Sequence, residues 1–145
     1  DAVTWADLGS GGGFPGLVIA ILAKEQRPQL RVVLVESDLR KATFLRQAVQ
    51  SLGLSAEVIS HRIEALPALN ADVLSARALA SLADLLGYAH THLKRSGVAI
   101  FPKGARFKEE LAEARKFWNF DVEQHPSLSD PEAAILVIRN LHRHD

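Results

Sequence analysis

The segment from Asp7 to Gly16, Asp-Leu-Gly-Ser-Gly-Gly-Gly-Phe-Pro-Gly, constrains the fold of this chain more than any other stretch. It follows the apolar run Val3 to Leu8 and precedes the apolar run Leu17 to Ala23, an order that predicts a strand, a glycine turn and a helix. Glycine adopts positive φ angles without steric cost and leaves space for a ligand beside the backbone. Free N–H groups at a helix start favour electron-rich ligand atoms. We therefore predict a ligand cradle in this turn that includes Gly11 and Gly13.

The rest of the chain alternates between predicted strands and predicted helices. The strands are 31–36, 56–60, 71–77 and 97–101, and the helices are 39–52, 81–93 and 108–117. Segments 121–123 and 133–138 form a final hairpin around Pro126 to Pro131. This alternation predicts an α/β fold with a mostly parallel sheet, helices on both faces and an antiparallel C-terminal hairpin.

Composition limits the class of protein. The length of 145 residues predicts a single domain, 1–145. No cysteine is present, which excludes disulfides and thiolate metal sites, and the six histidines are expected at the surface with no metal bound. No signal peptide or membrane span is visible, which fits a cytoplasmic protein. We also expect a monomer. Lys plus Arg and Asp plus Glu both number 17, so bulk charge does not favour nucleic acid. The absence of methionine suggests that the chain begins inside a longer protein.

Polar residues at the ends of the predicted strands mark the candidate site, because open α/β sheets bind ligands beyond the carboxyl ends of their strands. Glu36 ends the second strand, where a carboxylate can accept hydrogen bonds from both hydroxyls of a ribose. Its competing role is to stabilise the start of the following helix. Ser37 and Asp38 are able to cap that helix without it.

Two nucleoside ligands fit this arrangement. The segment 11–16 satisfies the G-x-G-x-x-G pattern of dinucleotide-binding turns, and a glycine turn followed by an acid also suits S-adenosylmethionine. The long last strand, placed after a hairpin, favours the sheet of a methyltransferase over a second nucleotide-binding half. A nicotinamide-dependent oxidoreductase and a non-catalytic nucleoside-binding or RNA-binding module remain the alternatives.

The motifs resemble a known family, the bacterial small-subunit (16S) ribosomal RNA guanine-N7 methyltransferases, also called glucose-inhibited division protein B. The likeness starts at Asp7 to Gly16 and continues in order through Glu36-Ser37, 41–46, 62–64, 75–82 and Lys103-Gly104. It implies a class I S-adenosylmethionine-dependent methyltransferase fold, which is Rossmann-like, and transfer of a methyl group to N7 of a guanosine in that RNA. The family carries a helical segment before this point, which is absent here, and we expect RNA methylation to be poor without it.

The resemblance also implies which residues contact the cofactor. Gly9 and Phe14 contact it from the glycine turn, Ile63 and Glu64 meet the adenine side, and Arg77 approaches the methionine part. Arg77 can pair with the cofactor carboxylate, and an ion pair with Asp72 or Glu36 is its alternative role.

The implied chemistry assigns no definite catalytic residue. Guanine N7 already has an exposed lone pair, so transfer depends on alignment and requires no general base. Arg77 and Lys103 are the candidates for acting near the reacting groups, and Arg62 and Lys103 can also meet RNA phosphate.

Phe14, Phe101 and Phe107 are candidate surfaces for base stacking, with core packing as the competing role. Basic residues gather in three groups: Arg40, Lys41 and Arg46; Lys103, Arg106 and Lys108; and Arg139 and Arg143. Only the second group follows the carboxyl end of a strand, so only that group is predicted to face the site.

Overall fold

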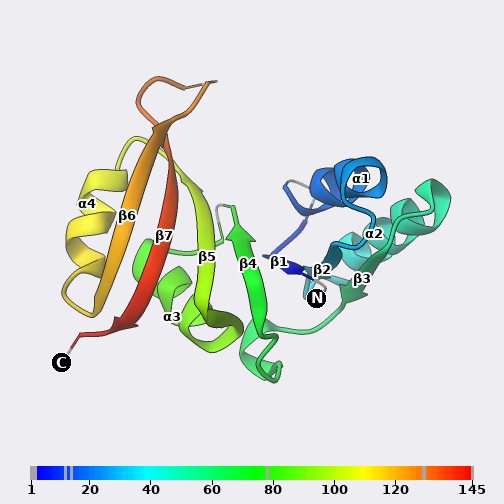
Figure 1. Cartoon of the computed structure of the whole chain (residues 1–145), viewed down its shortest axis with the longest axis horizontal. Coiled ribbons are helices and arrows are strands. Elements are labelled where there is room, and N and C mark those ends of the chain that lie inside the picture. Colours follow the sequence, from blue (N-terminus) through cyan, green and yellow to red (C-terminus); the bar gives the residue numbers. More distant parts are fainter. Residues whose placement is uncertain (1–2, 12, 14, 78, 129, 145) are drawn as a thin grey trace.

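The alternating apolar strands and amphipathic helices build a twisted sheet with helices on both faces (Figure 1). The structure is a computed structural model that describes residues 3–11, 13, 15–77, 79–128 and 130–144. Its strands are β1 (Thr4–Leu8), β2 (Arg31–Val35), β3 (Ala56–Ile59), β4 (Ala71–Ala76), β5 (Leu93–Lys103), β6 (Trp118–Pro126) and β7 (Ala134–Arg143). Its helices are α1 (Gly16–Gln26), α2 (Leu39–Leu52), α3 (Leu82–His92), α4 (Phe107–Ala114) and the short 3₁₀ helix η1 (Ile63–Ala65).

The described strands form one seven-stranded sheet in the order β3-β2-β1-β4-β5-β7-β6. The first five strands in this order are parallel, whereas β7 is antiparallel to both β5 and β6. The predicted mostly parallel sheet with an antiparallel C-terminal hairpin is therefore confirmed. The chain builds outward from β1 to β3 and then returns to place β4 on the other side of β1. The strand order thus reverses between β1 and β4, which is where such sheets bind ligands.

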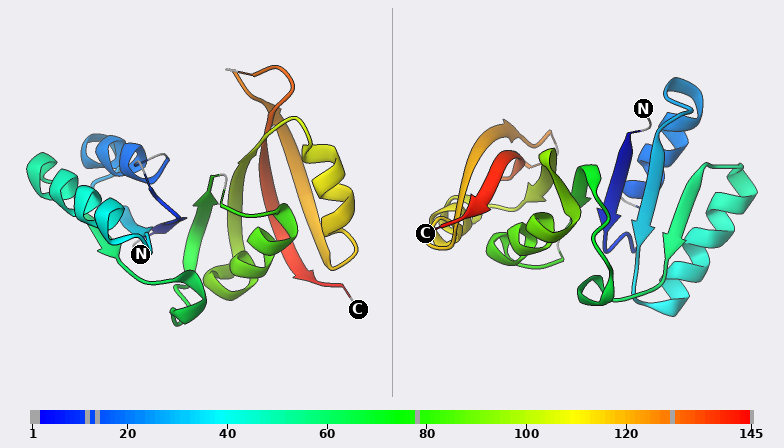
Figure 2. Two further views of the ribbon diagram at one scale, coloured as in Figure 1. Left: turned by 180° about the vertical axis from the view of Figure 1, so that it is seen from behind. Right: turned by 60° about the horizontal axis from the view of Figure 1, so that its bottom comes forward.

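The two faces of the sheet are covered by different helices, as the views in Figure 2 show. Strand β2 illustrates the division, because successive side chains of a strand point to opposite faces. Val32 and Leu34 pack with Leu17 of α1 and Leu45 of α2. Val33 and Val35 belong to the larger core cluster that includes α3 and α4. The continuous apolar run in β2 therefore reflects burial on both faces, as the sequence predicts.

Helix α2 begins and ends where its local sequence predicts. Asp38 Oδ1 accepts hydrogen bonds of 2.9 Å from the Arg40 N–H and 3.2 Å from the Lys41 N–H. Ala42 and Leu45 are buried, and Gly53 ends the helix in the left-handed conformation. The acidic cap places the first turn of α2 directly beyond β2, at the carboxyl edge of the sheet.

Three strands at the C-terminal side are longer than predicted. Strand β5 begins at Leu93 rather than at residue 97, and β6 extends from Trp118 to Pro126. Their added residues are mostly polar and exposed, so they carry no apolar pattern, and they are ordered by backbone pairing with neighbouring strands. Helix α4 ends at Ala114, before the predicted end at residue 117, and the chain turns there into β6.

Candidate functional site

A cleft of about 500 Å³ opens at the carboxyl ends of β1 to β4, where the strand order reverses. Its walls are the glycine turn after β1, the acidic end of β2, the turn after β3 and the loop after β4. The described residues that line it are Gly9, Gly11, Val35, Glu36, Ser37, Lys41, His61, Arg62, Ile63, Glu64, Arg77, Leu79 and Tyr88. The volume lies within the range of roughly 300–1,000 Å³ that is typical of small-molecule sites.

Beneath the glycine turn, the buried carboxyl group of Asp7 joins three elements. Its Oδ2 accepts a hydrogen bond of 3.1 Å from the backbone N–H of Gly16, which begins α1. Its Oδ1 accepts one of 2.8 Å from the Ser75 hydroxyl in β4. Ser75 Oγ accepts a further bond of 2.9 Å from the indole N–H of Trp5. Asp7 is absent from the predicted site residues, although the sequence marks it as an acid in an apolar strand, two residues before the first glycine.

Burial raises the pKa of Asp7 from 3.8 to about 6, and hydrogen bonds from serine hydroxyls and from the Gly16 N–H limit the rise. The close contact with α1 depends on glycine. A Cβ added to Gly16 would lie 2.6 Å from Asp7 Oδ2 and 2.5 Å from a methyl carbon of Leu34. The first motif therefore fixes the helix against the sheet through a glycine contact and a buried acid.

Glu36 follows β2 directly and has only 7% of its surface exposed. Its Oε1 accepts a hydrogen bond of 2.7 Å from the Gly11 N–H, and its Oε2 accepts one of 2.9 Å from the Asp38 N–H. The side chain thus braces the glycine turn and also supports the start of α2. Each carboxylate oxygen has two lone pairs, so each can accept one more hydrogen bond from a ligand. Two adjacent hydroxyl groups, as in a ribose, match this remaining capacity.

Two glycines of the turn, Gly11 and Gly13, have different positions relative to the cleft. Gly11 lines the cleft with a φ of +45°, a conformation that L-residues with side chains rarely adopt. Gly13 is buried behind the cleft, where its N–H donates to the Ser10 carbonyl and its carbonyl accepts from the Leu17 N–H. Gly13 therefore shapes the entry into α1 and does not line the cleft. Phe14 lies outside the described residues.

The cleft brings together most of the predicted cofactor contacts. Those that line it are Gly9, Gly11, Glu36, Ile63, Glu64 and Arg77. Their contact with a cofactor stays a prediction, but their gathering at one site from four separate strand ends agrees with it. Asp72, one alternative partner considered for Arg77, instead forms an ion pair of 3.1 Å with Lys94.

Lys103 stands at the carboxyl end of β5 with 8% of its side chain exposed. Its ammonium group donates to the Ala80 carbonyl and forms an ion pair with Glu110, both at 3.0 Å. Glu110 also accepts a hydrogen bond of 2.9 Å from the Leu82 N–H. Lys103 therefore holds the loop after β4 against α4. A role near the reacting groups or with RNA phosphate stays a prediction for this residue.

The prediction that only the second basic group faces the site is wrong. Lys41 of the first group lines the cleft, whereas Lys103, Arg106 and Lys108 are not among its lining residues. Arg106 is ion-paired with Glu109 on α4. The reason is that α2 starts immediately beyond β2, so its first turn lies at the same sheet edge as the strand ends. Of the three candidate stacking residues, Phe101 and Phe107 are buried in the core.

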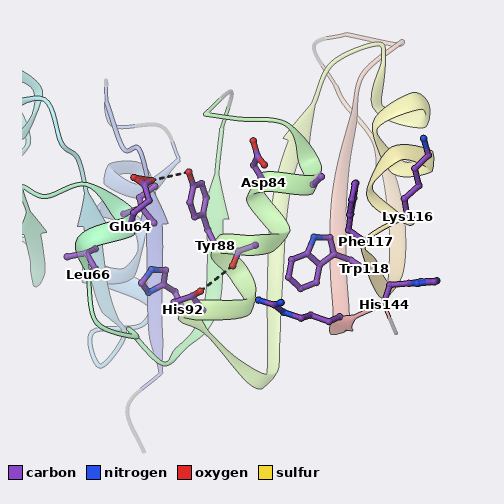
Figure 3. A pocket seen from close by; sticks show the side chains of 14 residues that line it. Glu64, Leu66, Asp84, Tyr88, His92, Lys116, Phe117, Trp118 and His144 are labelled. Atoms are coloured by element: carbon purple, nitrogen blue, oxygen red, sulfur yellow. Dashed lines mark hydrogen bonds between the residues drawn. The ribbon is translucent and has the colours of Figure 1, made fainter.

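A second hollow of about 930 Å³ lies over α3 and adjoins the cleft, with which it shares Ile63, Glu64 and Tyr88. Figure 3 shows Glu64 and Tyr88 on one side of α3, and Trp118 and Phe117 on the other. The Tyr88 hydroxyl donates a hydrogen bond of 3.1 Å to Glu64 across the shared wall. This hollow is larger than the cleft, but it has neither the glycine turn nor the ends of β1 and β2. We therefore assign the candidate cofactor site to the cleft.

The expectation that all histidines lie at the surface is wrong for His92. This residue ends α3 and lines the hollow with 1% of its surface exposed. Burial lowers its pKa, and a hydrogen bond with the backbone of Ile63 partly offsets that effect. His92 lies three residues after the buried Ala89 and seven after the buried Leu85, a helical spacing from which its burial could have been inferred.

The residues present suit an adenosyl cofactor. The cleft supplies a carboxylate with two spare acceptor positions in Glu36, an unhindered backbone at Gly11 and a guanidinium group in Arg77. Within the described residues, no helix is long and apolar enough to cross a membrane, and no three His, Asp or Glu side chains group as metal ligands.

The sequence matches the family model of rRNA small subunit methyltransferase G, GidB, over residues 1–137. The chain belongs to this family. It is 54% identical over 139 residues to ribosomal RNA small subunit methyltransferase G of Ruegeria pomeroyi, covering 96% of this chain and 68% of that protein. It is 56% identical over 137 residues to the protein of the same name from Cereibacter sphaeroides, covering 94% of this chain and 66% of that protein. The chain thus spans about two thirds of the length of these family members.

Solved structures share the fold of this family member. A SAM-dependent methyltransferase from Aquifex aeolicus aligns with a TM-score of 0.69 at 16% identity, over 94% of this chain and 80% of that one. TYW2 from M. jannaschii, solved in complex with AdoMet, aligns with a TM-score of 0.68 at 18% identity, over 97% of this chain and 69% of that one. The predicted Rossmann-like methyltransferase fold is confirmed.

Proposed function

We propose that this chain is an S-adenosylmethionine-dependent methyltransferase that acts on N7 of a guanosine in small-subunit (16S) ribosomal RNA. The observation that carries the proposal is the cleft at the β1–β4 reversal, with its glycine turn braced by Glu36. Membership of the methyltransferase G family supports the cofactor and the RNA substrate. A nicotinamide-dependent oxidoreductase is disfavoured by the same membership. The cytoplasm, where ribosomal RNA meets its modifying enzymes in bacteria, is the expected location.

The residues of the cleft have distinct roles in this proposal. Glu36 accepts hydrogen bonds from the ribose hydroxyls while it holds the Gly11 N–H. Ile63 packs against the adenine, and Glu64 accepts from its exocyclic amine, because a carboxylate cannot donate to ring nitrogens. Arg77 pairs with the carboxylate of the methionine part. Asp7 stays beneath the turn, where it fixes the start of α1 and does not touch the ligand.

When bound, S-adenosylmethionine would supply a methyl group on a positively charged sulfur atom. Guanine N7 would form a bond to the methyl carbon from the side opposite the sulfur, the carbon–sulfur bond would break, and the sulfur would leave as the neutral thioether of S-adenosylhomocysteine. Guanine N7 exposes a lone pair and carries no proton, so the chain has no proton to remove before attack. The cleft residues therefore act by binding, by alignment and by excluding water from the approach. This chemistry agrees with a cleft in which the acids Glu36 and Glu64 are engaged in hydrogen bonds.

Two measurements test the proposal. Titration calorimetry with S-adenosylmethionine, NAD and NADP in parallel is expected to show binding of the first ligand alone. Transfer of a tritiated methyl group to small-subunit ribosomal RNA, followed by chemical cleavage at N7-methylguanosine, is expected to locate the product. Binding of a dinucleotide in place of S-adenosylmethionine would contradict the cofactor assignment. A methylated position other than guanine N7 would contradict the assigned target atom.

A further inference from the structure

The first turns of α2 carry an exposed basic and aromatic surface beside the cleft. It consists of Arg40, Lys41 and Phe44, here called the α2 rim. Residues three and four positions apart on a helix are neighbours, so both cations lie next to Phe44. The Phe44 side chain is large and apolar, yet 49% of it is exposed. Burial of Ala42 and Leu45 on the opposite side of the helix fixes this orientation.

The rim cations form no ion pair with any acid that the structure describes. Among the described residues, no Asp or Glu oxygen lies within 4.0 Å of the charged groups of Arg40 or Lys41. The neighbouring acid, Asp38, accepts hydrogen bonds from their backbone N–H groups instead. Many other exposed cations are neutralised by ion pairs, namely Arg31, Lys94, Arg106, Lys116 and Arg139.

Position separates the rim from the remaining unpaired cations. Within the described part of the chain, these other cations also lack an acidic partner: Lys24, Arg27, Arg46, Arg62, Arg95, Lys108, Arg115 and Arg143. Arg115 lies over the Phe120 ring and Arg143 over the Trp118 ring, but neither of these two cations lines the cleft. Lys41 lines the cleft, and so does Arg62, which is exposed on the turn after β3. A polymer whose base enters the cleft therefore meets cations at its mouth. The chain has a formal net charge of zero, yet positive charge is in local excess at the rim, because many of the other cations are neutralised by acids beside them.

Resting on the proposed function, we propose that the α2 rim binds the single-stranded RNA that flanks the target nucleotide. Arg40 and Lys41 contact phosphates, and Phe44 stacks on an unpaired base. Cations that follow the backbone beside aromatic side chains are the arrangement by which proteins hold single-stranded nucleic acids. A base that enters an enclosed cleft must also leave its helical stack, which exposes neighbouring bases to such a surface.

The test compares two double variants of the chain with equal changes in charge and aromatic content. Arg40→Ala with Phe44→Ala removes the rim members that do not line the cleft. Lys94→Ala with Phe117→Ala is the matched control, because Phe117 is 56% exposed and Lys94 is an exposed cation at the opposite end of the sheet. Binding of a labelled single-stranded RNA of about 12 nucleotides is measured between about 50 and 200 mM salt. Calorimetry with S-adenosylmethionine is run on each variant.

The rim variant is expected to bind RNA at least about tenfold more weakly, because stacking on one aromatic side chain alone contributes about 5-fold to 150-fold. Its salt slope is expected to fall by about 0.7, the value for one lost phosphate contact on a single strand. Affinity for S-adenosylmethionine stays unchanged, and the control variant binds both ligands as the parent does. Equal RNA affinity in the parent and the rim variant, or no RNA binding by the parent, would overturn the proposal. The methyl-transfer assay reports separately on the proposed function, so RNA binding through the rim without transfer would overturn that function alone.

Discussion

The cleft and the hollow over α3 adjoin each other but are built from different parts of the chain. The cleft, at about 500 Å³, is formed by strand ends and by a glycine turn whose backbone is held by Glu36. The hollow, at about 930 Å³, is formed by side chains of α3, η1 and the strand ends near the C-terminus. The Tyr88–Glu64 hydrogen bond belongs to the wall between them.

The difference lies in how the two spaces are built, and volume alone does not decide which of them is the candidate cofactor site. In the hollow, Trp118 already has partners, since the His90 ring lies 5.2 Å away and the Arg143 guanidinium group 5.8 Å away. In the cleft, Glu36 keeps acceptor capacity that backbone contacts hold in a fixed direction. A small ligand gains affinity from groups that need no rearrangement on binding. Variants on each side of the shared wall should therefore differ in their effect on the cofactor.

The largest effect is expected for Gly11→Val. Space exists for a Cβ atom, which would lie 3.6 Å from the Gly9 carbonyl oxygen, but a β-branched residue is strained at a φ of +45°. The turn then shifts, and S-adenosylmethionine binding is expected to be lost in calorimetry while the circular dichroism spectrum is retained. Gly104→Val is the matched control, because nothing lies within 4 Å of its added Cβ. Normal binding of S-adenosylmethionine by Gly11→Val would show that the glycine turn does not form part of the cofactor site.

Asp7→Asn is expected to change the pH dependence of stability. The pKa of Asp7 rises from 3.8 unfolded to about 6 folded, so its protonated form is favoured by folding. This contribution is complete below about pH 4 and is lost as the pH rises through 6. A shift of about 2 pKa units corresponds to about 3 kcal/mol.

The free energy of unfolding of Asp7→Asn, relative to the parent, should therefore rise by up to about 3 kcal/mol between pH 4 and 7. Urea unfolding at several pH values measures it. Lost hydrogen bonds add an offset that does not vary with pH. A hydrogen bond from the Thr4 N–H and contact with Lys94 lower the pKa of Asp72. The free energy of unfolding of Asp72→Asn, relative to the parent, should therefore change with the opposite sign, falling as the pH rises towards 4. A flat difference for Asp7→Asn would mean that the folded and unfolded pKa values are equal.

Glu36→Ala is expected to weaken cofactor binding by about 1–3 kcal/mol, since it leaves hydroxyl groups and the Gly11 N–H without an acceptor. Glu36→Gln should weaken cofactor binding less than Glu36→Ala does. An amide oxygen can still accept one hydrogen bond, but its NH₂ group then faces the N–H of either Gly11 or Asp38. Calorimetric affinities of the two variants give the comparison. If both variants bind the cofactor as tightly as the parent does, Glu36 does not contact the cofactor and only supports the start of α2.

The smallest effect on the cofactor is expected for Trp118→Ala on the far side of the shared wall. Affinity for S-adenosylmethionine should remain within about twofold of the parent, because the side chain contacts α3 and Arg143 and not the cleft. Thermal unfolding should show a lower midpoint, as expected when a half-buried aromatic side chain is removed. A large loss of affinity would show that the two spaces act as one site.

The sequence predicts what local signals determine. Helix α2 is predicted at 39–52 and found at Leu39–Leu52, since its cap, apolar spacing and terminal glycine all lie within one segment. Strand β6 is underpredicted because its polar residues are ordered only by pairing with β7. At the site, glycines and acids at strand ends are found in advance, but Lys41 and Tyr88 are missed. Both come from helices, whose orientation is set by packing against the sheet rather than by a motif.

The chain contains two tryptophans, and they stand in different halves of the molecule. Trp5 reaches Asp7 through the Ser75 hydroxyl, below the glycine turn, whereas Trp118 lies over α3 beside Arg143. Indole emission responds to nearby charge and to solvent. With Trp118 replaced by Phe, the protein would have a single tryptophan, beside its first motif, so ligand arrival and titration of the buried acid could be followed by exciting that indole selectively, without an attached dye.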